Sequence, residues 1–281
     1  MVNAYRPSTI DEALRIRNET KALPLAGGTD LMVRYKNWAG LPPKFSQPVM
    51  FVAHLHELKG IEVEGDELII RSATTLTELL KDGRVPEVLK LAVKEMASPL
   101  VRNIATIGGN ICNASPAGDT LPPLYALDAK VVLRSVEGER TVPIEDFITG
   151  PGQTVLKENE ILCEIRIPMD EFDSIFYRKV GTRRANALSK VSFVGLKNLQ
   201  GDRIDDIRIA FGAVAPTVVR SRDAEKMLKG IRIDEIEQIY PSIEAKYAEL
   251  IRPIDDQRST AEYRKIVSLR LLRFFLLGKA D

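Results

Sequence analysis

The chain has 281 residues, with 40 lysine and arginine residues against 39 aspartate and glutamate residues and a formal net charge of +1. This balance argues against nucleic acid or an anionic membrane as the main partner. Hydrophobic residues make up 44% and charged residues 28%, as in globular proteins, and a chain of this length usually forms two domains. The sequence contains no run of about 18 apolar residues and no apolar core near its N-terminus, so we expect a cytoplasmic protein without a membrane span.

Residues that bind metals are sparse in this sequence. Cys112 and Cys163 are its two cysteines, whereas an iron–sulfur cluster needs about four cysteine ligands, so a cluster is expected only in a partner. His54 and His56 lie two residues apart and would share one face of a strand, but no third ligand is near. We therefore predict a structural or surface role for both histidines and no metal site.

The first 170 residues are expected to mix helices and strands. Ser8 or Thr9 can cap the first helix, and Thr74 or Thr75 with Glu78 resembles a capping box at the start of another. The expected elements are a helix over 10–17, a strand over 21–26, helices over 31–35, 74–80 and 86–97, a strand over 67–73, a strand-like segment over 101–111, a helix over 121–127, and strands over 130–135 and 160–167.

A second group of elements is expected after a domain boundary at residues 168–170. Residues 173–179, 190–198 and 204–214 are predicted to form three strands of a second sheet. Two helices are predicted to follow, at about 222–229 and 257–277. The pattern as a whole predicts an α+β fold.

Two glycine pairs about eighty residues apart are the main chemical signal. Gly27-Gly28 and Gly108-Gly109 each follow an apolar, strand-like segment, and each is expected to offer clustered backbone N–H groups that can hold a phosphate. Neither pair belongs to a Gly-x-Gly-x-x-Gly motif, and no Walker lysine follows. Because a single Gly-Gly pair is more often only a turn, these pairs alone indicate no more than a weak nucleotide site.

The residues around both pairs resemble a known family. Ala26 to Leu31, together with Thr106 to Asp119, closely resembles the FAD-binding subunit of the xanthine dehydrogenase and carbon monoxide dehydrogenase family. The resemblance continues through Gly150-Pro151-Gly152, Asn159 to Pro168, Arg183 to Ser192, Ala210 to Thr217 and Ser259 to Arg264. It covers essentially the full chain.

The resemblance implies a fold and its domain limits. It predicts a two-part FAD-binding domain of the PCMH type over residues 1–170, with subdomains of about 1–55 and 56–170. A C-terminal α+β domain with a small antiparallel sheet and helices would follow over residues 171–281.

The same resemblance implies residues that bind FAD. Matched to the family, the two glycine loops would bind its diphosphate and neighbouring sugar through Leu25, Ala26, Gly27, Gly28, Thr29, Asp30 and Leu31, and through Thr106, Ile107, Gly108, Gly109 and Asn110. Asp119 would accept hydrogen bonds from sugar hydroxyls, and Leu162 would bring backbone near the flavin. Lys179 would lie beside the cofactor, where a cation could stabilise negative charge on the reduced ring. The alternative for Lys179, Arg183 and Arg184 is a solvated basic stretch.

The resemblance implies an enzyme in which substrate oxidation and electron transfer take place in different subunits. A large subunit with a molybdenum cofactor would oxidise the substrate, a small subunit with [2Fe–2S] clusters would relay electrons, and this FAD-binding oxidoreductase subunit would pass them to NAD⁺ or another acceptor. No acid–base side chain of this chain is needed for that chemistry, so no catalytic residue is predicted. Two alternatives stay open: a stand-alone flavin-dependent oxidoreductase, and a nucleotide-binding assembly module without redox activity.

Overall fold

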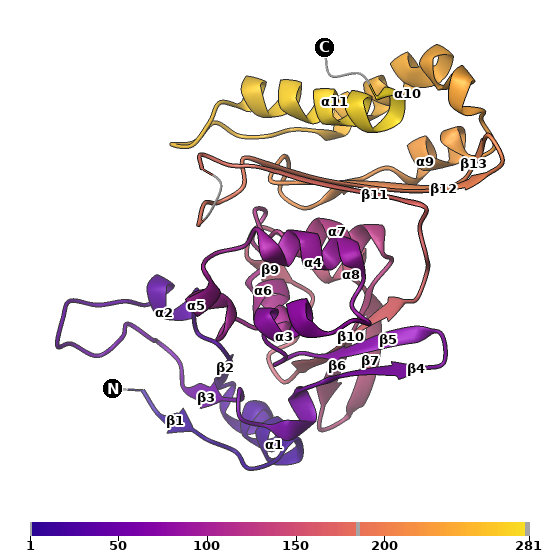
Figure 1. The fold of residues 1–281 in the computed structure, drawn as a ribbon. Coiled ribbons are helices and arrows are strands. Elements are labelled where there is room, and N and C mark those ends of the chain that lie inside the picture. The colour runs from indigo at the N-terminus through magenta and orange to yellow at the C-terminus, as the bar shows by residue number, and fades with distance from the viewer. Residues whose placement is uncertain (1, 184–185, 279–281) are drawn as a thin grey trace. The chain divides into compact units, whose positions relative to one another are not determined.

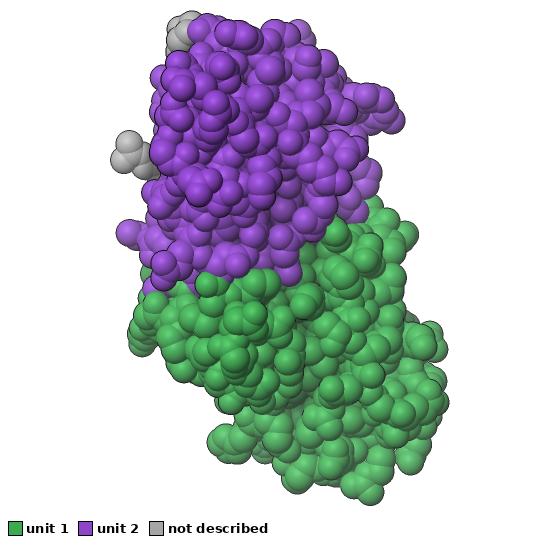
Figure 2. Space-filling view, turned by 90° about the vertical axis from the view of Figure 1, so that its right-hand side faces the viewer, with its two compact units in different colours: residues 1–85, 97–114, 129–169 green, residues 86–96, 115–128, 170–281 purple. Residues whose placement is uncertain are grey.

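The computed structural model describes residues 2–183 and 186–278, and Figure 1 shows the order of their helices and strands. Arg184 and Ala185, which belong to one of the matched segments, lie outside the described residues. The chain forms two compact units (Figure 2). Unit 1 comprises residues 1–85, 97–114 and 129–169, and unit 2 comprises residues 86–96, 115–128 and 170–281.

Unit 1 contains two main sheets. A three-stranded sheet has the order β1-β3-β2 with parallel pairs, and a five-stranded antiparallel sheet has the order β4-β5-β10-β6-β7. The elements of this unit are β1 (Ala4–Tyr5), α1 (Ile10–Thr20), β2 (Leu23–Leu25), α2 (Leu31–Arg34), β3 (Val49–Phe51), a 3₁₀ turn (His56–Leu58), β4 (Ile61–Glu64), β5 (Glu67–Arg71), α3 (Leu76–Lys81), α5 (Pro99–Arg102), α6 (Ile107–Asn113), β6 (Lys130–Ser135), β7 (Gly138–Pro143), α8 (Ile144–Phe147), β8 (Ile148–Gly150), β9 (Gln153–Thr154) and β10 (Ile161–Pro168).

Local side-chain caps explain where two helices of unit 1 begin. The Thr9 hydroxyl accepts a hydrogen bond from the Glu12 N–H at the start of α1. Thr75 and Glu78 form a complete capping box at the start of α3, which confirms the prediction from the sequence. The apolar side of α1 then packs with Met50 and Val52 in a buried core.

Unit 2 has one antiparallel sheet with helices on both faces. Its order is β11-β12-β13-β14, and α10 and α11 cover the face opposite α4 and α7 (Figure 1). Phe193 and Phe211 belong to the core under α10 and α11. The elements are α4 (Glu87–Lys94), α7 (Leu121–Ala126), β11 (Ser174–Val180), β12 (Val191–Gln200), β13 (Arg203–Gly212), β14 (Val219–Arg220), α9 (Arg222–Leu228), a 3₁₀ turn (Ile233–Glu235), α10 (Ile236–Leu250) and α11 (Ala261–Leu277).

The two compact units are interleaved along the sequence. Residues 86–96 and 115–128 belong with the C-terminal residues because α4 and α7 pack against β11, β12 and β13. The two units therefore differ from the ranges 1–170 and 171–281. The domain limits implied by the resemblance stay a prediction.

Three expectations about secondary structure were wrong. His54 and His56 do not share a face of a strand, because β3 ends at Phe51 and His56 begins the 3₁₀ turn. Residues 101–111 were expected to be strand-like, but they lie in and between α5 and α6, whose starts are capped by Ser98 and Thr106. The helix α10 was missed because Pro241, which disfavours a helix interior, lies inside it. Buried side chains spaced along α10, such as Tyr240 and Tyr247, pack in the unit 2 core and outweigh that local preference.

Candidate functional site

The first glycine loop, residues 26–30, connects β2 to α2 in unit 1. Gly28 has a φ of +68°, which L side chains rarely adopt. A Cβ added at Gly27 would lie 2.2 Å from the Ile104 carbonyl oxygen, so a glycine is needed where the loop touches the segment before Thr106. Among the described residues, no acceptor takes a hydrogen bond from the N–H groups of residues 27–30. This cluster of free N–H groups can bind an anion such as a diphosphate.

The second glycine pair differs from the prediction, because it lies inside the first turns of α6. The N–H groups of residues 107–110 all donate within the chain. Gly108 N–H donates to the Ser72 carbonyl at 2.9 Å, and Gly109 N–H donates to the Thr106 hydroxyl at 3.1 Å. The expected nest of free N–H groups was therefore wrong here. A Cβ at Gly108 would lie 2.6 Å from the Ser72 Cβ, so this glycine permits close packing.

Ser72 joins the second glycine pair to the segment that contains Leu162. Its N–H donates to the Cys163 carbonyl at 2.8 Å, while its own carbonyl accepts from Gly108. The register of β10 against β6 shifts between Leu162 and Glu164, which marks a bulge at this position. In unit 1 the first glycine pair thus packs against Ile104, and the second pair is linked through Ser72 to Cys163, the neighbour of Leu162. Ser72 is a residue that the sequence analysis missed.

The Arg17 side chain forms hydrogen bonds with the residues just before β2 and with the residue just before β10. Its side chain is buried, and its guanidinium donates to the carbonyl oxygens of Ala22 at 2.8 Å, Lys21 at 3.1 Å and Glu160 at 3.3 Å. Burial lowers the pKa of the Arg17 guanidinium. The sequence held one signal for this role, since a charged residue occupies a position on the apolar face of α1.

Replacing Arg17 with methionine is expected to destabilise the chain by about 2–4 kcal/mol, because the buried bonds to the carbonyl oxygens of Ala22 and Glu160 lose their charged donor. FAD affinity should fall with it, by about tenfold, since Ala22 leads into the first glycine loop and Glu160 leads into Leu162. Urea unfolding and FAD titration measure both effects. Arg15→Met is the matched control, since Arg15 is exposed on the same helix; equal losses in both variants would contradict this role.

Unit 2 places Asp119 beside Lys179 and Ser189. The Lys179 ammonium lies 2.7 Å from one carboxylate oxygen of Asp119 and also donates to the Glu95 carbonyl at 3.1 Å. The Ser189 hydroxyl donates to the other oxygen of Asp119. Burial raises the pKa of the Asp119 carboxyl, and the attraction of Lys179 opposes this rise. The alternative of a solvated basic stretch fails for Lys179, whose side chain is only 6% exposed.

Tyr177 carries an unused hydrogen-bonding group on the same face of β11 as Lys179. Within the described part of the chain, its buried hydroxyl has no hydrogen-bond partner. Burial raises the pKa of this phenol, so the hydroxyl keeps its proton. A buried donor without a partner is costly, and a bound cofactor with acceptor atoms would satisfy it. Each unit thus offers groups that suit part of a flavin nucleotide: unit 1 has free backbone N–H groups for a phosphate, and unit 2 has a carboxylate, an ammonium and a free hydroxyl.

Metal ligands do not gather among the residues that the structure describes. No group of three or more His, Cys, Asp or Glu side chains lies close enough to hold a metal ion. Cys112 and Cys163 are both free thiols. In the same described ranges, no helix is both long and apolar enough to span a membrane.

Comparison with known proteins decides the family. Residues 1–170 match the FAD binding domain in molybdopterin dehydrogenase, and residues 176–278 match the CO dehydrogenase flavoprotein C-terminal domain. The chain belongs to the FAD-binding subunits of the molybdenum hydroxylases. It is an oxidoreductase subunit of the xanthine dehydrogenase and CO dehydrogenase type, and its cofactor is FAD, which confirms the resemblance.

Relatives of this FAD-binding subunit cover nearly its whole length. It is 31% identical to the xanthine dehydrogenase FAD-binding subunit of Escherichia coli O157:H7, over 92% of this chain and 89% of that protein. It is 30% identical to the glyceraldehyde dehydrogenase medium chain of Sulfolobus acidocaldarius, over 93% and 92%. A solved carbon monoxide dehydrogenase chain from Hydrogenophaga pseudoflava has a TM-score of 0.89 and 27% identity, over 99% and 96%. The predicted α+β fold with a FAD-binding and a C-terminal domain is thereby confirmed.

Proposed function

We propose that this FAD-binding subunit receives electrons from the [2Fe–2S] clusters of a small partner subunit and passes them to NAD⁺ or another acceptor. A large partner with a molybdenum cofactor oxidises the substrate. The observation that carries the proposal is the first glycine loop, where the N–H groups of residues 27–30 have no acceptor among the described residues and suit a diphosphate. When bound, FAD supplies the exchange of single electrons and electron pairs.

The proposed FAD contacts are distributed over the residues that the sequence predicted. Residues 25–31 bind the diphosphate through backbone N–H groups. At the second glycine pair, where these groups are already occupied, the side chains of Thr106 and Asn110 rather than free backbone N–H groups make the contact. The Leu162 backbone borders the flavin.

Asp119 and Lys179 each keep bonding capacity for the cofactor. Each carboxylate oxygen of Asp119 has two lone pairs and binds one partner, so it can also accept a hydrogen bond from a sugar hydroxyl. Lys179 has three ammonium protons and uses two of them. Its remaining proton can be donated to an acceptor atom of the flavin.

The proposed partners rest on the relatives and on composition. The relatives are named as subunits or medium chains of enzymes that act on xanthine and glyceraldehyde, so chains with about 30% identity to this one serve different substrates. Substrate choice is accordingly proposed for the molybdenum subunit. Two cysteines favour a partner as the carrier of the iron–sulfur clusters. We also propose a cytoplasmic location, in which both thiols stay reduced.

The test is cofactor uptake followed by reduction in the presence and absence of partners. The purified chain should show flavin absorption at about 375 and 450 nm and should release FAD on denaturation. Its flavin should stay oxidised with xanthine or an aldehyde alone, and it should be reduced only after both partner subunits are added. Adding NAD⁺ should then reoxidise it if NAD⁺ is the acceptor.

Other outcomes separate the alternatives. Flavin reduction by a substrate without partners would establish a stand-alone oxidoreductase. A colourless chain that takes up no added FAD would favour the assembly module and overturn the proposal.

A further inference from the structure

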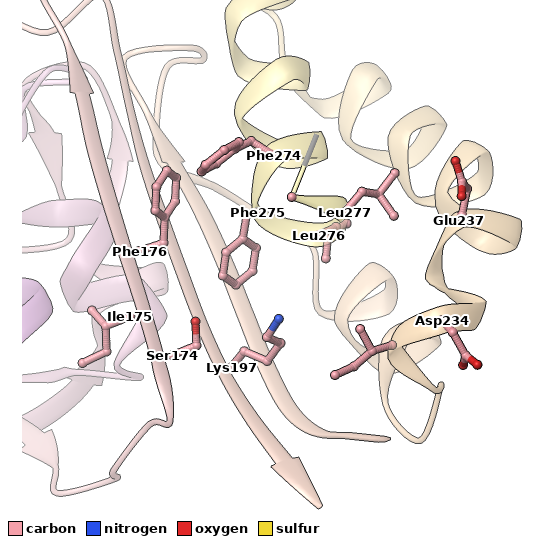
Figure 3. A pocket seen from close by; sticks show the side chains of 12 residues that line it. Ser174, Ile175, Phe176, Lys197, Asp234, Glu237, Phe274, Phe275, Leu276 and Leu277 are labelled. Atoms are coloured by element: carbon pink, nitrogen blue, oxygen red, sulfur yellow. The ribbon is translucent and has the colours of Figure 1, made fainter. Parts of the chain in front are cut away.

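A groove of about 530 Å³ lies in unit 2, away from Asp119 and Lys179 on the sheet face that α10 and α11 cover. Figure 3 shows its side chains coming from β11, β12 and the last turns of α11, and on another side from the 3₁₀ turn with Asp234 and from α10 with Glu237. This volume is within the range of about 300–1,000 Å³ that is typical of small-molecule sites. The groove plays no part in the proposed FAD contacts.

Aromatic rings form the floor of the groove. The rings of Phe176 and Phe275 are stacked at 6.2 Å between centroids, and Phe274 lies 5.4 Å from Phe176. Gly195 makes room for this floor, because a Cβ there would lie 2.6 Å from the Phe275 ring. Phe274 is 41% exposed, so part of the aromatic surface is open to a ligand.

Among the described residues that line the groove, Lys197 is the one with a positively charged side chain. The Lys197 ammonium lies 5.5 Å from the centre of the Phe275 ring, and Ser174 is its direct neighbour across the β11–β12 pair. Lys197 forms no ion pair with any carboxylate of the described residues. The Lys197 ammonium is partly removed from water, and this burial lowers its pKa. An anion placed beside it would replace the missing water.

The two acidic residues of the groove do not neutralise Lys197. Asp234 is held by the Arg232 guanidinium at 3.0 Å. In Figure 3 the side chains of Asp234 and Glu237 lie on the opposite side of the groove from Lys197. Positive charge and aromatic floor therefore lie together, and negative charge lies apart from both.

We propose that this groove binds an aromatic carboxylate, with its ring on Phe274 and Phe275 and its carboxylate on the Lys197 ammonium. The Ser174 hydroxyl, next to Lys197, can donate a second hydrogen bond to the carboxylate. Aromatic rings favour offset or edge contacts of the kind that this floor offers. The charge-assisted hydrogen bond orients the ligand, because it is about twice as strong as a neutral one.

The test uses three probes that share one ring system. Titration of the full-length chain with 2-naphthoate, followed by ligand fluorescence, should give a dissociation constant on the order of 0.1–1 mM. The neutral 2-naphthamide and the cationic 2-naphthylmethylammonium should bind at least about fivefold more weakly, since neither forms an ion pair with an ammonium. The comparison isolates charge from ring contacts.

Variants then assign the binding to the groove. Lys197→Met keeps the aliphatic stem and should weaken 2-naphthoate binding about five- to tenfold, while Lys197→Arg should retain most of it. Phe274→Ala should weaken all three probes. Lys226→Met is the matched control, because Lys226 is a highly exposed lysine of the same unit and does not line the groove.

Three results would overturn the proposal: no saturable binding of 2-naphthoate up to several times the expected dissociation constant, equal binding of the cationic probe, or undiminished binding by Lys197→Met. FAD content is recorded in the same samples. Because the groove and the FAD contacts share no residue, loss of one binding activity leaves the other measurable.

Discussion

Replacing Gly27 with valine is expected to abolish FAD retention. A Cβ at Gly27 would lie 2.2 Å from the Ile104 carbonyl oxygen and 2.8 Å from its carbonyl carbon, which are backbone atoms that cannot rotate away. The loop must then move, and its free N–H groups no longer converge on a diphosphate. Losing two hydrogen bonds to a charged group should lower FAD affinity by about a hundredfold or more. Spectroscopic titration of the purified apo-chain with FAD measures this loss.

The second glycine pair should respond differently to the same substitution. Gly108→Val places a Cβ 2.6 Å from the Ser72 Cβ inside unit 1, so we expect lower folding stability as well as lost FAD. Gly83→Val is the control for both, since a Cβ there meets no atom within 4 Å. Full FAD affinity in Gly27→Val would refute the diphosphate assignment.

Lys179→Met should be strongly destabilising, because it leaves a buried carboxylate without its cation. The side chains of Lys179 and Asp119 are 6% and 7% exposed. Breaking a buried ion pair by removing one partner costs about 3–5 kcal/mol. Urea unfolding monitored by circular dichroism measures the change, and the FAD content of the same variant shows whether the cofactor depends on this ammonium.

The pH dependence of this variant has a definite sign. Without Lys179, only burial and the Ser189 hydrogen bond act on Asp119, so the pKa of its carboxyl should lie further above the unfolded value of about 3.9. The folded chain then keeps a proton that the unfolded chain releases. Its stability is therefore greatest below the unfolded pKa and falls as the pH rises toward the folded one. The loss relative to wild type should be larger at pH 8 than at pH 5.

The double variant Asp119→Asn with Lys179→Met tests the cause. Removing both charges should restore part of the stability lost in Lys179→Met, because no buried charge is left unpaired. If the double variant loses the sum of the two single effects, the residues do not act as a pair. The stability lost in the Lys179→Met variant would then result from lost packing of the aliphatic part of the lysine side chain.

Several features followed from the sequence alone because their causes are local. The caps at Thr9 and at Thr75 with Glu78 need partners three residues away, so a short window of sequence contains the whole interaction. The first glycine pair was likewise identified as a turn after β2. The family resemblance, carried by motifs along the whole chain, determined the cofactor and the subunit type.

Tertiary structure decided the rest, because the contacts involved join residues far apart in the sequence. Asp119 meets Lys179 sixty residues away, and Arg17 reaches Glu160 across 143 residues. No local pattern shows that the Ser72 carbonyl accepts a hydrogen bond from the Gly108 N–H. The sequence therefore could not distinguish a phosphate-binding nest from the tightly packed start of a helix. The helix α10 forms despite Pro241 because its buried face packs in the core of unit 2, which outweighs local propensity.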